Sequence, residues 1–171
     1  MGSTIIISFL VGFIVLCWSL SVSANKFNIT VQNLGNGVHD LNSDSLYDVL
    51  FNTSPNAADT VYNSTLSPPE LTSTSNAQEI AGGNGYTQGG TKIGSTAYSQ
   101  TGGLATLTGS NVVFTATGNV GPLRYVVCID ETAGTSSTRP PLLWWDYGSS
   151  ITLLNGETLT VNHSAGILTL Q

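Results

Sequence analysis

Apolar and polar positions alternate along most of the chain beyond residue 25, in short runs closed by glycine, proline, asparagine or serine. Alternation with a period of two is typical of strands that bury one face. It predicts a strand over 27–31 and another over 45–51, where β-branched and aromatic residues outweigh a competing helical stripe. No sustained helical pattern is present beyond residue 25. Further strands are expected at 104–108, 112–116, 123–129, 142–147, 151–154, 158–161 and 167–170.

The connections between these runs carry strong turn signals. Residues 109–111 predict a hairpin or a tight corner, and Asn155-Gly156 predicts a hairpin between its flanking strands. The segment 52–76 is rich in serine, threonine, asparagine and proline, and it is expected to be one long loop. In the glycine cluster 82–90 the spacing fits turns rather than a phosphate-binding loop, and Tyr86 is the expected anchor that fixes this loop to the core.

Together these elements predict an all-β fold, an antiparallel β-sandwich or jelly-roll-like barrel. The nearly continuous apolar run 123–129 predicts a central strand that is buried on both faces. The length predicts one domain over residues 25–171, large enough to bury a substantial core.

Residues 1–24 form a hydrophobic leader, expected to be helical, that ends in the small-residue pattern of a signal peptidase site. Three interpretations stay open. The segment is a cleaved signal peptide, an uncleaved membrane anchor, or an upstream extension of the true start. The first two place the protein outside the cell or at a membrane.

Charge limits the possible partners. The chain carries four basic and ten acidic residues, a formal net charge of -6, and only 8% of its residues are charged. No basic patch can neutralise a row of phosphates, so nucleic acid is not an expected partner. The polar surface is expected to be built from serine, threonine, asparagine and glycine.

The sequence shows no set of residues that would support catalysis. His39, His163 and Cys128 have no neighbouring signature of a catalytic triad or zinc site, and Cys128 is expected to be a small buried hydrophobic residue. The acids at 40, 44 and 48 recur every four residues but lack the glycine and the closing glutamate of a calcium loop. Asp130 and Glu131 are expected at a solvated loop end. We therefore expect no enzyme activity, no cofactor and no metal ligand.

Trp144 and Trp145 are the most prominent aromatic pair. Consecutive strand residues face opposite sides, so both are buried only if the strand is covered on both faces. Core or subunit-interface packing is the first interpretation, and a stacking platform for sugar rings is the alternative. Together with Tyr86, these two are the expected interaction residues. Asn-x-Ser/Thr acceptor patterns occur at residues 28, 52, 63 and 162.

Four segments, taken in order, resemble a family of small structural proteins of tailed-phage virions. They are residues 84–91, 124–130, 141–148 and 156–170. The resemblance implies a β-sandwich that decorates the head or joins the tail and has no catalytic residues. It implies a homo-oligomer located in the virion, with copies of itself and major capsid or tail proteins as partners. The rival hypothesis is a secreted or membrane-anchored module that binds carbohydrate or acts as an adhesin.

Overall fold

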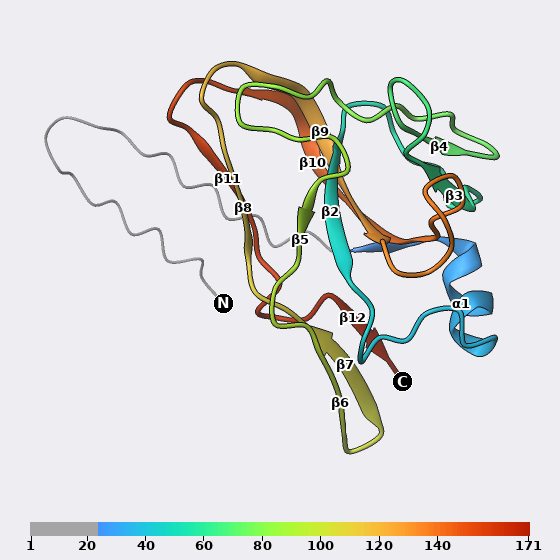
Figure 1. Cartoon of the computed structure of the whole chain (residues 1–171). Helices are drawn as coiled ribbons and strands as arrows, with labels where there is room; N and C mark the ends of the chain where they lie inside the picture. The colour runs from blue at the N-terminus through green and yellow to red at the C-terminus, as the bar shows by residue number, and fades with distance from the viewer. Residues whose placement is uncertain (1–23) are drawn as a thin grey trace, which may run out of the picture.

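The structure is a computed structural model that describes residues 24–171, and it is built mainly of antiparallel strands (Figure 1). The leader predicted over 1–24 lies, apart from its last residue, outside the described residues. Within 24–171, no helix has the length and apolar character needed to cross a bilayer. The elements are β1 (Asn25–Lys26), α1 (Asn28–Gly35), β2 (Leu46–Phe51), β3 (Val61–Asn63), β4 (Glu70–Thr72), β5 (Thr91–Lys92), β6 (Ala97–Thr101), β7 (Leu104–Thr108), β8 (Val112–Thr115), β9 (Val120–Asp130), β10 (Pro141–Leu153), β11 (Thr158–Val161) and β12 (Leu168–Leu170).

A five-stranded antiparallel sheet in the order β1-β10-β9-β2-β5 organises the molecule. Its central strand β9 pairs with β10 on one side and with β2 on the other. Residues 125–130 of this strand are all buried, which confirms the predicted central strand. Smaller antiparallel sheets pair β8 with β11, β7 with β6 and β12, and β3 with β4.

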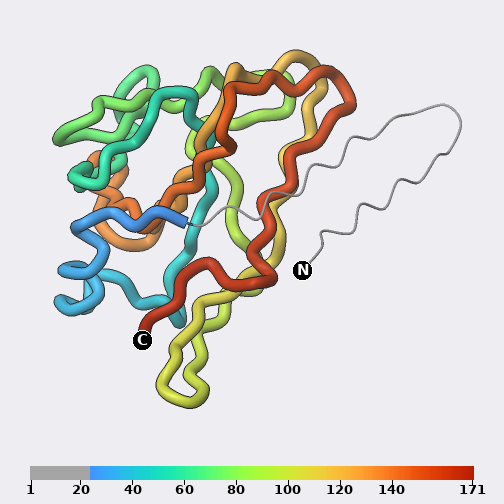
Figure 2. Tube along the Cα trace, turned by 180° about the vertical axis from the view of Figure 1, so that it is seen from behind, coloured from blue at the N-terminus to red at the C-terminus, as the bar shows by residue number. Residues whose placement is uncertain are grey.

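Each face of this sheet has its own hydrophobic core, because successive side chains of β2 and β9 point to opposite sides. Leu50 and Val126 face the larger core, which is completed by side chains from β7, β8, β11 and β12. Val49 and Val127 face the smaller core, which is completed by the β3–β4 pair and by Phe27. Figure 2 shows the β6–β7 hairpin extending away from this body, close to the C-terminus.

The strand predicted over 27–31 is wrong, because the chain forms helix α1 from Asn28. Pairing with β10 ends at Lys26, and the Thr30 hydroxyl then donates to the Leu142 carbonyl, with an Oγ1–O distance of 2.8 Å. Phe27 is buried whereas Val31 is 56% exposed, so the apolar alternation of this segment does not mark a buried face. The Thr30 hydroxyl thus bonds to the beginning of β10, a contact with a distant segment that the apolar pattern does not record.

Residues 109–111 form a corner, the second of the two predicted alternatives, since β7 and β8 belong to different sheets. Two other predicted connections and one strand differ from the structure. Asn155-Gly156 is a turn, with Gly156 at φ +87°, yet it joins β10 to a strand that pairs with β8 and so closes no hairpin. The predicted strand 151–154 is instead the end of β10, which continues through irregular pairing after Asp146. The predicted loop 52–76 contains β3 and β4.

Candidate functional site

The two histidines and the cysteine of residues 24–171 are buried, and each histidine is hydrogen-bonded to an aspartate. His163 reaches Asp48 of β2 with an Nε2–Oδ2 distance of 2.7 Å, and both side chains are fully buried. Burial raises the pKa of Asp48, and the bond to His163 offsets only part of that rise. The pair ties the segment after β11 to the five-stranded sheet.

A second buried pair joins the loop after α1 to the end of β9. His39 Nδ1 lies 2.8 Å from Asp130 Oδ2, and neither side chain is exposed. Asp130 is therefore not the solvated loop end that the sequence predicted. Burial alone would raise its pKa, but hydrogen bonds from His39 and from the Ala133 amide outweigh this and hold the pKa below its usual range.

Asp44 completes a small cluster with His39 and Asp130, in which one ligand atom from each residue lies within 4.8 Å of the others. Such a set could hold a cation. The spacing of acids at 40, 44 and 48 did not indicate this grouping, because Asp48 bonds to His163 instead. Hydrogen bonds already account for the geometry, since Asp130 Oδ1 accepts from the Thr132 and Ala133 amides at 3.0 Å.

Cys128 is fully buried beside Asp48, its register partner on β2, as the sequence predicted for a small hydrophobic residue. Burial, and then the nearby charges of Asp48 and Asp130, raise the pKa of its thiol well above the ordinary value. A thiol in this environment stays protonated and is a poor nucleophile. The two buried pairs therefore act as structural links: one connects the segment after β11 to β2, and the other connects the loop after α1 to β9.

The loop 82–90 folds as predicted, with Tyr86 as its anchor. Gly83, Gly85, Gly89 and Gly90 all have positive φ angles. At Gly90 a Cβ atom would come within 2.0 Å of the Asp48 carbonyl oxygen, so only glycine allows the loop to lie against β2. Tyr86 is buried, and its hydroxyl lies 2.5 Å from Glu79 Oε1.

Glu79 is the centre of this anchor. Its carboxylate accepts hydrogen bonds from the Tyr62 hydroxyl at 2.6 Å, from the Tyr86 hydroxyl, and from the Gly89 amide at 2.8 Å. Burial raises the pKa of Glu79, and the three donors lower it only in part. One carboxylate thereby connects strand β3 to the middle and to the C-terminal part of the glycine loop.

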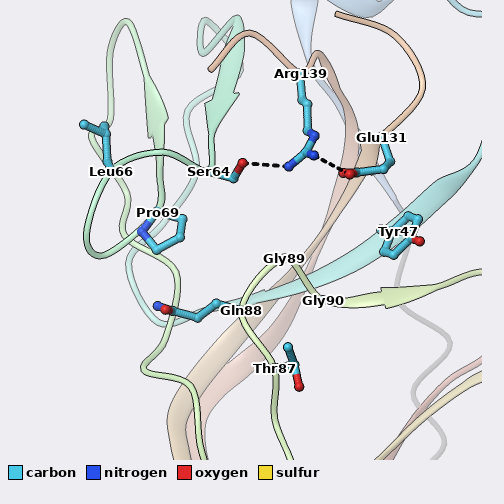
Figure 3. Close-up of a pocket in the computed structure, with 10 residues that line it drawn as sticks. All are labelled: Tyr47, Ser64, Leu66, Pro69, Thr87, Gln88, Gly89, Gly90, Glu131 and Arg139. Atoms are coloured by element: carbon cyan, nitrogen blue, oxygen red, sulfur yellow. Dashed lines mark hydrogen bonds and ion pairs between the residues drawn. The ribbon is translucent and has the colours of Figure 1, made fainter. Parts of the chain in front are cut away.

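A polar groove lies on the outer side of this loop (Figure 3). It has a volume of about 510 Å³ and runs between the β3–β4 turn, residues 64–69, and the Thr87–Gly90 loop. Figure 3 shows Arg139 on one side, where its guanidinium donates to Ser64 and to Glu131, with Tyr47 at one end and Leu66 at the other. No histidine or cysteine of residues 24–171 lines this groove.

The two tryptophans are both packed, one on each face of β10. The Trp144 ring lies 4.5 Å from that of Phe27 between centroids, and the Trp145 ring lies 5.4 Å from that of His163. Both are half-buried. The strand is therefore covered on both faces, which is the condition under which the sequence allowed both residues to pack inward. Of the three predicted interaction residues, Tyr86 is too deeply buried to touch a partner directly.

The sequence analysis did not predict the two buried aspartate–histidine pairs, although the positions of the aspartates are informative. Asp48 and Asp130 each stand in or directly after a continuous apolar run, where an unpaired carboxylate would be costly to bury. Their histidine partners lie 115 and 91 residues away along the chain, so the pairing could not be assigned.

Comparison with known proteins adds no relative. No protein-family model matches the chain, and neither the curated proteins nor the solved structures yield a match.

Proposed function

We propose that this chain is a non-enzymatic structural protein of a phage particle, and that many copies bind to the head lattice as a decoration protein. The observation that carries the non-enzymatic part is the enclosure of His39, His163 and Cys128, which are buried and so are out of reach of a substrate. The virion assignment is supported by the four ordered segments between residues 84 and 170 that resemble phage structural proteins.

We also infer that the fold is a β-sandwich of the jelly-roll-like kind, formed as one domain over 25–171. In its support, the larger core lies between one face of the five-stranded sheet and the strands β7, β8, β11 and β12. The smaller core on the opposite face shares β2 and β9 with the larger one, so the two cores would be expected to unfold together.

The surface suits side-by-side packing of copies. The β6–β7 hairpin, residues 97–108, contains no charged residue, and Leu104 at its tip is 42% exposed. An uncharged projection can approach a neighbouring copy or the head surface without repulsion or a large desolvation cost. The loops 52–76 and 82–90 are the other proposed contact regions, and the second is held rigid by Tyr86.

A tail-associated position is the alternative within the same class. The carbohydrate-binding platform proposed for the tryptophans has less support from the geometry, because Trp144 and Trp145 pack against interior side chains. A flat pair of exposed rings on one face would have favoured it.

Co-sedimentation tests the proposal. Purified protein is expected to pellet with expanded empty heads that lack it, to saturate at a fixed copy number, and to leave pre-decorated heads unchanged. Isolated tails serve as the second target. A protein with a normal circular dichroism spectrum that pellets with neither particle would contradict the virion assignment.

A further inference from the structure

We propose that the groove between residues 64–69 and 87–90 binds a neutral saccharide. This inference goes beyond the structural role proposed above and does not depend on it. A volume of about 510 Å³ falls within the range of small-molecule sites and can take one or two sugar rings.

The charges that line the groove select an uncharged ligand. Arg139 donates to Glu131 through Nη2 and to Ser64 Oγ through Nη1, at 2.7 Å for the latter. This ion pair leaves the wall nearly neutral while it still presents donors of the guanidinium and an acceptor oxygen of the carboxylate. Because the two charges compensate each other, the wall offers little net attraction to an anion or to a cation. Vicinal hydroxyl groups, which both donate and accept, match such a wall.

The opposite wall supplies further polar groups. The Gln88 side-chain amide donates to the Ile80 carbonyl at 3.2 Å through Nε2, which orients the amide and leaves Oε1 for an incoming hydroxyl. The Thr87 hydroxyl lies on the same loop, and both residues are exposed.

The ends of the groove are apolar, which matches the C–H face of a sugar ring. Tyr47 of β2 stands at one end, and Leu66 and Pro69 stand at the other (Figure 3). The face of an aromatic ring carries partial negative charge and attracts polarised C–H groups. A polyol with one polar edge and one apolar face is therefore the ligand class that uses both kinds of lining.

The groove is also preorganised. Gly89 is held by Glu79, and Gly90 lies directly against the Asp48 backbone, so the loop needs no reordering when a ligand enters. A fixed loop lowers the entropic cost of binding.

Saturation-transfer NMR tests the proposal on the full-length protein. The probes are glucose, galactose, mannose and N-acetylglucosamine with their disaccharides, and inorganic phosphate and acetate serve as anionic probes. We expect at least one neutral sugar to bind with a Kd of about 1 mM, and Gln88→Ala and Tyr47→Leu each to weaken it about tenfold. Gln100→Ala, an exposed change of the same type on β6, is the matched control and should leave the Kd unchanged.

Three outcomes would overturn the proposal: no transfer to any sugar at about 20 mM, binding that both groove variants leave unaltered, or binding of phosphate or acetate alone. Because Gln88 is exposed, its variant should retain the wild-type melting temperature and remain informative even if Tyr47→Leu unfolds. Head binding is measured separately, so failure here would not be confused with failure of the structural role.

Discussion

Replacing Glu79 with alanine is expected to lower the free energy of unfolding by about 3–5 kcal/mol. The change leaves the hydroxyl groups of Tyr62 and Tyr86 and the amide of Gly89 without their acceptor, and both tyrosine side chains are buried. Each buried donor left unpaired costs about 1–3 kcal/mol, and partial relaxation keeps the total below the sum. Urea unfolding followed by tryptophan fluorescence measures the loss as a shift of the midpoint at constant slope.

Two matched variants separate the contributions. Glu79→Gln keeps an acceptor oxygen and most of the volume, so it should be clearly more stable than Glu79→Ala. Tyr86→Phe removes one hydroxyl, which leaves the Leu50 amide without its acceptor and should cost about 1–2 kcal/mol. If Glu79→Ala loses less than about 1 kcal/mol, the carboxylate is not the centre of the anchor.

The second large effect is expected at the pair of Asp48 and His163. Asp48→Ala should cost about 3–5 kcal/mol, because it leaves a buried imidazole unpaired at Nε2, and its Nδ1 already has no partner among the described residues. Asp48→Asn preserves the shape and one hydrogen bond to a neutral imidazole. It should therefore lose at least about 2 kcal/mol less than Asp48→Ala in the same urea titration. Equal losses in the two variants would show that the hydrogen bond contributes little.

Titration provides an independent check on Asp48. Burial raises its pKa in the folded protein above the ordinary value of 3.8. A raised pKa means that the folded state holds this proton more tightly, so the contribution is full below pH 3.8 and is lost as the pH rises through the folded pKa. The difference in unfolding free energy between wild type and Asp48→Asn should therefore fall with increasing pH. A difference that increases with pH would mean that the carboxylate is stabilised in its charged form.

The strands of the larger core could be predicted because each shows its buried face in the sequence. Alternation in β8 and β11 reflects packing on one face, and the largely apolar runs in β2 and β9 reflect burial on both faces. The glycine loop and its tyrosine anchor were also predictable, since positive φ angles and close backbone approach demand glycine.

The hydrophobic pattern of the sequence did not predict those elements whose packing depends on only one or two buried side chains. Strands β3 and β4 bury one large apolar residue each, Tyr62 and Leu71, within a segment otherwise rich in serine, threonine and proline. Helix α1 buries Thr30 and Asn33 rather than an apolar stripe. The β3–β4 pair and helix α1 are fixed by contacts with distant parts of the chain, which local hydrophobicity does not record.

The groove could not be predicted for a related reason. Arg139, Ser64 and Tyr47 come from three separated segments, and each is an ordinary polar or aromatic residue in its own context. Only the topology, which places the β3–β4 turn opposite the glycine loop, brings them together.

Mass spectrometry of particles purified from the natural source tests the central claim most directly. The account predicts peptides from residues 25–171 in the particle fraction, in a copy number comparable to that of the major capsid protein, and the most N-terminal peptide will show whether residues 1–24 remain. Recovery of the protein only in the culture medium or in membranes, with none in the particles, would contradict the account.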